Sequence, residues 1–367
     1  MSGAAPADGA DGADGAEGAA ALDARPLPWA RRLLAYGVPV AGIVGLVVLS
    51  FGIGKFPVQP GELWRLLSSA LFGGAHGLPD TYEAVVYRVR LPRIGTAALV
   101  GAGLAAAGAT YQGLFRNPLV SPDILGVSSG AGFGAALAIL LALPVVAVQG
   151  MAFVFGLAAV SVVYLIATLV RGQHEPLLVL VLAGVVVGAL FSAAISLIKY
   201  VADPYDQLPA ITFWLLGGLS GMRLADIAPV LIPIAIGVVP LALLRWRLNV
   251  LSLDDEEARA LGVRTGPLRA LAIVCATLMT AAAVSIAGMV GWVGLIVPHV
   301  VRNLVGSDYR KVVVGCLFVG PALMVGADVG ARLALSPVQI PVGIVTGLVG
   351  GPYFLYLMRK RQNMGEI

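Results

Sequence analysis

Long stretches without a charged side chain constrain this chain more than any other feature of its sequence. Between Ile94 and Leu114 no residue is charged, and a helix needs about 20 apolar residues to cross a hydrocarbon core of roughly 30 Å. Charged residues make up only 12% of the chain and hydrophobic residues 59%, whereas a soluble domain carries roughly 25% charged residues. The sequence therefore predicts an all-α polytopic membrane protein.

About ten such stretches divide residues 29–367, which we expect to form one transmembrane domain. The eighth is short, because glycines and Pro298 interrupt it, and irregular backbone at membrane depth is tolerated only where protein or a water-filled cavity covers it. Residues 55–90 are predicted to form an extramembrane loop with a short amphipathic helix near 60–71, and another short helix near 208–220 is predicted at a membrane face. The predicted spans are 33–54, 94–114, 126–143, 145–170, 177–200, 226–244, 268–289, 297–305, 312–333 and 340–358.

The positive charges indicate an orientation. With both termini in the cytoplasm, about two thirds of the 24 lysines and arginines fall on the cytoplasmic side, which is the usual bias. The exceptions are Arg88, Arg90 and Arg93 outside, joined by Arg332 at the end of the ninth span. Residues 1–28 are Ala, Gly and Asp repeats without an apolar period, which predicts a disordered cytoplasmic tail.

A weak internal echo suggests two repeats. One apolar helix runs into Gly113–Pro118 and another runs into Gly294–His299. If spans two to five and seven to ten are repeats, the single span between them makes the repeats inverted. Inverted repeats place a transport pathway near their interface.

Several kinds of chemistry are not indicated. None of the four lysines stands in a GxxxxGK[ST] motif, so the chain does not hydrolyse ATP by that route. The histidines His76, His174 and His299 lie apart, without the spacing of metal ligands. Cys275 and Cys316 stand in apolar runs, as small buried hydrophobes do. We expect no catalytic residue, metal or cofactor in this chain; His299 fits a cap or packing role, with substrate contact as the alternative.

Two charged features each leave two interpretations open. Asp328 and Arg332 stand four residues apart on the ninth span, so they share a helix face. They form either a mutual ion pair or a site where Asp328 fixes an Arg332 that faces a partner, because ionisable groups at membrane depth are functional candidates. The loop 245–267 is the most charged stretch, and is either a solvated connector or a docking helix.

Eight motifs recur in an order that resembles a known family. They are RLPR (90–93), GxxxQGLFRNPL (108–119), SPDILGVSSGAG (121–132), TFWLLGGLSG (212–221), ARALGV (258–263), GWVGLIVPHVVR (291–302), GADVGARL (326–333) and PVGIVTGLVGGPYFLYLM (341–358). Over about residues 30–360 the chain resembles the permease subunit of type II ABC importers for iron chelates, haem and vitamin B12.

The resemblance implies partners and a location. A homodimer in the bacterial inner membrane would carry two separate ATP-binding subunits, which hold the ATP and Mg, and would receive a periplasmic binding protein. Its surroundings would be membrane lipid, and nucleic acid is not a partner.

The resemblance also implies sites. Arg90, Arg93 and Arg332 would pair with carboxylates of the binding protein. The ATPase would contact the loop between spans six and seven. The pathway would follow mainly the fifth helix, with help from the third, eighth and tenth. The coupling candidates are Asp254, Asp255, Glu256, Glu257, Ala258, Arg259, Leu261 and Gly262, and the pathway candidates are Ser192, Ser196, Trp214 and His299.

The cargo and two rival classes remain open at this stage. A ferric siderophore or haem is the expected cargo, with a corrinoid or an oxyanion such as molybdate as alternatives. An ion-coupled secondary transporter would need carboxylates within its spans, and Asp328 is nearly alone there. An intramembrane enzyme would need a Ser/His pair, paired aspartates or HExxH, and the spans show none of these.

Overall fold

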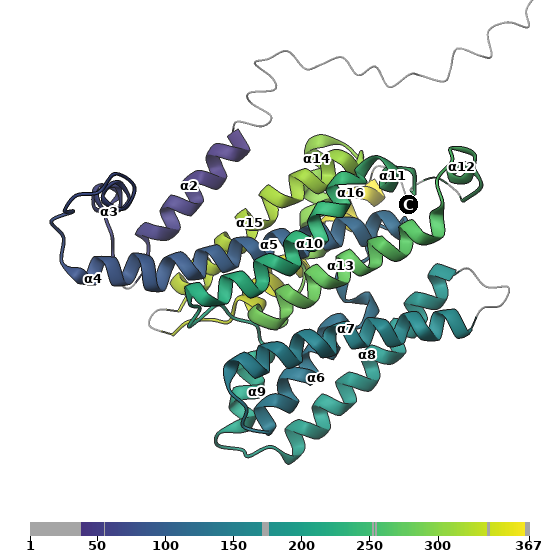
Figure 1. The fold of residues 1–367 in the computed structure, drawn as a ribbon, viewed down its shortest axis with the longest axis horizontal. Coiled ribbons are helices and arrows are strands. Elements are labelled where there is room, and N and C mark those ends of the chain that lie inside the picture. Colours follow the sequence, from purple (N-terminus) through teal and green to yellow (C-terminus); the bar gives the residue numbers. More distant parts are fainter. Residues whose placement is uncertain are drawn as a thin grey trace, which may run out of the picture. The chain divides into compact units, whose positions relative to one another are not determined.

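The computed structural model describes residues 38–54, 56–170, 176–251, 253, 255–335 and 338–363. From Gly42 onward they belong to one compact unit, and every regular element in these ranges is a helix (Figure 1). The predicted all-α fold is confirmed over this part of the chain. The predicted tail 1–28, His174 and Asp254 lie outside the described residues.

Each predicted span contains one helix. Six helical segments of the described part are long and apolar enough to cross a membrane, and four shorter apolar helices accompany them. Among the short ones is α14, as the glycines and Pro298 predict. The helices are α2 (Val38–Gly52), α5 (Leu91–Leu114), α6 (Val127–Leu140), α7 (Val145–Leu169), α8 (Pro176–Val201), α10 (Ile227–Leu243), α13 (Thr265–Ala287), α14 (Val293–Val305), α15 (Tyr309–Leu333) and α16 (Val342–Asn363).

Shorter helices mark the two ends of the bundle. In Figure 1, α3 (Pro60–Phe72) and α4 (Asp80–Glu83) lie where α5 begins, while α11 (Arg245–Val250) and α12 (Asp255–Ala260) lie at the opposite end. α9 (Gln207–Leu215) follows α8 and confirms the short helix predicted near 208–220. α3 is amphipathic, because Leu66 is fully buried while Trp64 is 68% exposed.

The second span begins earlier than predicted. Residues 80–90 were expected in an extramembrane loop, but α4 continues through the π-helical turn η2 (Ala84–Arg90) directly into α5. The RLPR motif therefore lies inside one helical segment, Asp80–Leu114. Pro92 stands in the first turn of α5, directly after the π-helical turn.

Close backbone contacts place α5 at the centre of the fold. Most of its side chains are small and buried, and small residues let helix backbones approach within a membrane. A Cβ added at Gly101 would lie 2.3 Å from the carbonyl oxygen of Gly320, and one at Gly108 would lie 1.9 Å from that of Gly294. α5 is thereby fixed against α15 and α14.

The helix lengths and contacts support the predicted repeats. α5, α6, α7 and α8 have 24, 14, 25 and 26 residues, and α13, α14, α15 and α16 have 23, 13, 25 and 22. The packing is reciprocal: α5 contacts α14 and α15, and α13 contacts α6 and α7. Two related four-helix units that exchange their first helices would give this pattern.

Candidate functional site

A buried carboxylate joins two of the three singled-out arginines. Asp328 is fully buried on α15; its Oδ1 lies 2.8 Å from Nε of Arg93 on α5, and its Oδ2 lies 3.1 Å from Nε of Arg332, one turn along α15. Of the two interpretations of Asp328 and Arg332, the structure shows the ion pair. It also adds Arg93, which sequence spacing could not reveal because 235 residues separate it from Asp328.

The remaining guanidinium groups hold the end of α2. Arg332 donates to the carbonyl oxygen of Ile53 at 3.0 Å and to the hydroxyl of Ser50 at 2.6 Å. Arg90 donates to the carbonyl oxygens of Phe51 and Phe56. Carbonyls at a helix C-terminus carry partial negative charge and lack intrahelical donors, so cations are favourable there.

This arginine cluster, defined as Arg90, Arg93, Arg332 and Asp328, has internal partners for each guanidinium. Arg90 is 5% exposed and Arg93 is 8% exposed, so the three arginines do not form the open row that a docking surface suggests. The cluster nevertheless contains three positive groups and one carboxylate, two of the arginines contacting that carboxylate, so its net charge is positive. Docking of a binding protein on these residues stays a prediction.

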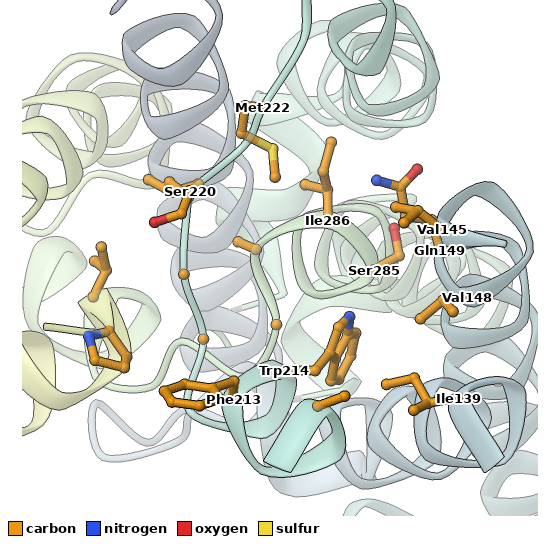
Figure 2. A pocket seen from close by; sticks show the side chains of 18 of the residues that line it. Ile139, Val145, Val148, Gln149, Phe213, Trp214, Ser220, Met222, Ser285 and Ile286 are labelled. Atoms are coloured by element: carbon orange, nitrogen blue, oxygen red, sulfur yellow. The ribbon is translucent and has the colours of Figure 1, made fainter. Parts of the chain in front are cut away.

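A cavity of about 680 Å³ adjoins this cluster. Figure 2 shows aromatic and aliphatic side chains along one part of its wall, including Trp214, Phe213 and Val148, with Gln149 and Ser285 beside them. Arg93 also lines it and donates to Oε1 of Gln339 at 2.9 Å. Trp214 therefore lies at a cavity of ligand size, since such pockets are about 300–1,000 Å³.

The other pathway candidates do not meet at this cavity. Ser192 and Ser196 lie exposed on α8, and each hydroxyl donates to a carbonyl oxygen of its own helix, at 2.9 and 3.0 Å. Their face of α8 is broad, uncharged and apolar, with Leu182, Val186, Leu190 and Leu197 exposed. His299 lies half-buried on α14, one residue after Pro298. The structure thus places the four candidates on three surfaces.

The coupling candidates form a small exposed helix with buried anchors. In α12, Ala258 is fully buried while Glu256, Glu257 and Arg259 are exposed. Gly262 ends the helix with φ of +77°, and the N–H of Val263 donates to the carbonyl oxygen of Ala258 at 3.0 Å. A left-handed glycine with such a bond is a common helix C-cap, so the ARALGV motif ends α12.

The end of α12 exposes an apolar side chain close to acidic ones. Leu261 is 53% exposed, an apolar side chain next to the charges of Glu256 and Glu257. Asp255 begins α12, whereas Asp254 lies outside the described residues.

Sequence reasoning missed the residues that hold this segment to the bundle. Arg116, just beyond α5, donates through Nε to the carbonyl oxygen of Leu251 at 3.3 Å and through Nη2 to that of Leu253. Asn249 on α11 accepts from the N–H of Tyr309 at 2.9 Å, and the Tyr309 hydroxyl lies 2.9 Å from that of Thr110. The one available signal was an arginine and asparagine directly after an apolar helix.

The turn before α15 is also fixed by charge. Asp308 caps α15 by accepting from the N–H of Arg310, and the hydrogen bond from the Arg310 side chain lowers the pKa of Asp308.

In the described residues no group of three or more His, Cys, Asp or Glu side chains could hold a metal ion.

The fold and these sites define a class of protein: a multi-pass membrane permease whose sequence carries no P-loop. The model of the FecCD transport family matches residues 42–360, and the chain belongs to that family.

Curated relatives and a solved structure agree with the family. The molybdate import system permease protein MolB of Haemophilus influenzae is 38% identical over 323 residues, covering 88% of this chain and 94% of the relative. The cobalamin import system permease protein BtuC of Halobacterium salinarum is 42% identical over 309 residues, covering 83% and 82%. A solved metal-chelate type ABC transporter in an inward-facing conformation has a TM-score of 0.79 and 37% identity, covering 90% of this chain and 99% of that chain. The chain is therefore a permease of the ABC importer family, a translocation subunit.

Proposed function

We propose that this chain is the membrane half of an ATP-driven importer that carries a metal chelate from the periplasm to the cytoplasm. Two copies form the passage, two separate ATP-binding subunits with their ATP and Mg drive it, and a periplasmic binding protein delivers the cargo. Both termini, and the α12 end of the bundle, face the cytoplasm of the bacterial inner membrane.

The exposed helix α12 carries this proposal. A connector between α10 and α13 needs only a few residues, yet the chain builds a capped helix there. The fully buried Ala258 anchors it, while Leu261 is 53% exposed. Exposed apolar side chains with charges around them are typical of protein contact sites. The segment is therefore suited to receive a separate ATP-binding subunit.

Leu261→Arg tests this contact. Placing a charge in the apolar part of an interface should lower binding-protein-stimulated ATP hydrolysis roughly tenfold or more, since hot-spot changes cost on the order of 2 kcal/mol. The matched control is Leu71→Arg, another exposed leucine on α3 at the opposite end. The complex is purified from the native membrane with each variant, and its ATP turnover is measured. Equal turnover in both variants would contradict the proposal.

The arginine cluster is proposed as the outer docking site for acidic groups of the binding protein. Its three cations against one buried carboxylate leave a net positive charge, and such charge raises association rates. Arg332→Gln removes one charge and keeps a donor for Ser50 and Ile53. We expect weaker association with the binding protein, at its largest in low salt, and an unchanged elution volume. An affinity equal to the parent's at low salt would refute this role.

The face of α8 is the proposed wall of the passage. It offers apolar side chains with the hydroxyls of Ser192 and Ser196, both satisfied within the helix. A second copy facing it would enclose a weakly polar channel, which suits a large chelate that must be released again. Trp214 and His299 are kept as further pathway candidates on their own surfaces.

The names of the relatives support several cargoes. Permeases for molybdate, cobalamin and hemin are all similar to this chain, the hemin transport system permease protein HmuU of Yersinia pestis being 36% identical over 333 residues. We propose a ferric siderophore or haem, with corrinoid and molybdate as the alternatives. The discriminating measurement is which loaded binding protein stimulates ATP turnover of the reconstituted complex.

An ion-coupled secondary transporter is the rival from another class. Its carboxylate would have to take up and release a cation or proton during transport. Asp328 lies 2.8 and 3.1 Å from two guanidinium groups, so fixed cations of the chain already occupy its carboxylate. This pairing disfavours the rival.

A further inference from the structure

A proline in α14 leaves one backbone carbonyl without its helical donor. Pro298 has no N–H, so the carbonyl oxygen of Gly294, four residues earlier, cannot receive the usual hydrogen bond. The side-chain amide of Gln112 on α5 fills this place. Its Nε2 lies 3.4 Å from the oxygen of Gly294 and 3.3 Å from that of Leu295, and Gln112 is 2% exposed.

The other end of the same amide is held by α14 as well. Arg302, in the last turn of α14, donates through Nη1 to Oε1 of Gln112. Gln112 therefore contacts both ends of the half-length helix, with its donor on Gly294 and its acceptor on Arg302. Backbone contact between Gly108 and Gly294, one turn away, fixes α5 against α14 at the same level.

Four residues after Gln112, the chain makes its link to the coupling segment. Arg116 has φ of +50°, a conformation that is uncommon outside glycine and worth an explanation. Its guanidinium donates to the carbonyl oxygens of Leu251 and Leu253, which precede α12. Leu251 is itself buried, so this bond forms at the base of the segment.

We propose that Gln112 and Arg116 are positioning residues that tie α14 and α12 to the C-terminal end of α5, so that the two helices move together. This proposal rests on the proposed function, because it names the route by which a push on α12 reaches the broken helix. Gln112 and Arg116 are only four residues apart in the chain, and the segment that contains α5 is the most buried of the candidate spans in the described residues. A displacement of the coupling segment therefore also moves α14, instead of changing only the conformation of the loop.

The test compares Gln112→Met with a control variant that also loses a buried hydrogen-bonding group. Gln112→Met keeps the approximate length of the side chain and removes both hydrogen-bonding groups. Gln112→Glu keeps the acceptor for Arg302 and removes the donor to Gly294. The control is Thr280→Val, because the buried Thr280 hydroxyl donates only to Ala276 within its own helix, at 2.8 Å.

Spin labels report the link without any knowledge of the cargo. Ala260→Cys on α12 and Leu304→Cys on α14 are exposed positions, whereas the native Cys275 and Cys316 are buried. Labelled chain is diluted with unlabelled chain so that one copy per complex carries the pair. The distance distribution is recorded for the chain without nucleotide and for the complex trapped with ADP and vanadate.

In the parent and in Thr280→Val we expect a narrow distribution whose centre is the same in both states. Gln112→Met should broaden the distribution in the nucleotide-free chain and shift its centre on trapping. The width of the distance distribution for Gln112→Glu should lie between that of the parent and that of Gln112→Met. Distributions for Gln112→Met that match Thr280→Val would overturn the proposal.

The two proposals fail in different ways. If the parent complex shows no ATP turnover stimulated by a binding protein, the proposed function fails. The nucleotide-free distributions still decide whether Gln112 ties α12 to α14, because that comparison needs no partner subunit.

Discussion

Asp328 is the buried carboxylate that compensates the positive charges of Arg93 and Arg332. Its carboxylate accepts a hydrogen bond from Arg93 and forms an ion pair with Arg332 at 3.1 Å, with no exposure to solvent. Removing one partner of a buried ion pair leaves the other charge uncompensated, which costs more than replacing the whole pair by apolar groups.

Asp328→Asn should therefore lower the free energy of unfolding by about 3–5 kcal/mol. The double substitution Arg93→Met with Asp328→Leu should cost less than the single one, since it removes charge on both sides and leaves Arg332 its bonds to Ser50 and Ile53. Denaturant unfolding in detergent measures both. A double variant less stable than Asp328→Asn would show that the pair itself, not the uncompensated charge, dominates.

At the same scale, the sequence predicted the important arginines but not their geometry. The RLPR motif and the i, i+4 spacing drew attention to Arg90, Arg93, Asp328 and Arg332. That Arg93 reaches Asp328, or that Arg332 holds Ser50 and Ile53, depends on helices brought together by tertiary packing, which spacing along one helix does not encode. The same reason explains why Arg116 and Gln112 were not recognised.

Helix packing around α5 depends on glycines, whose lack of a side chain lets neighbouring backbones approach closely. At Gly108 the neighbouring atom is a backbone carbonyl, which cannot move aside as a flexible side chain can. Such contacts explain why Gly108 and Gly294 occur in helices that would otherwise tolerate alanine.

Gly108→Ala should strongly destabilise the fold or prevent its assembly, because its Cβ would lie 1.9 Å from the carbonyl oxygen of Gly294. Gly113→Ala, on the same helix, should be tolerated, because its Cβ would lie 3.5 Å from the ring of Tyr309, an ordinary contact. Yield and thermal unfolding of the purified variants measure the difference. A Gly108→Ala protein as stable as Gly113→Ala would disprove the close approach of α5 and α14.

Element boundaries followed local chemistry, with one instructive exception. Pro298 and the glycines before it predicted the short α14, whereas the end of α12 at Gly262 was not predicted. The segment 80–90 was expected in a loop because it is charged, but Val86 is fully buried there and the chain stays helical through a π turn. Polar composition alone cannot distinguish a loop from a helix that packs one face.

For the whole molecule, the two ends of the bundle should be separated by the membrane. α9 and α3 belong to the end where α5 begins, and α12 belongs to the other (Figure 1). Positive charges predict that the α12 end is cytoplasmic.

Tyr205→Cys, at a position 93% exposed before α9, should react with a membrane-impermeant maleimide added to spheroplasts. Ala260→Cys on α12 should react only after the membrane is opened. The buried Cys275 and Cys316 provide a low background. The reverse pattern would invert the proposed orientation and, with it, the assignment of the docking and coupling ends.

The attachment of α2 has a consequence for this whole arrangement. Its C-terminal end and the residues directly after it are held by Arg332 and Arg90 through the carbonyls of Phe51, Ile53 and Phe56, and not by close backbone contacts of the kind that fix α5. A carboxylate arriving from outside would compete with those carbonyls for the same guanidinium groups. The first helix would then loosen or tighten with each visit of a delivery protein, and would itself register whether the outer face is occupied.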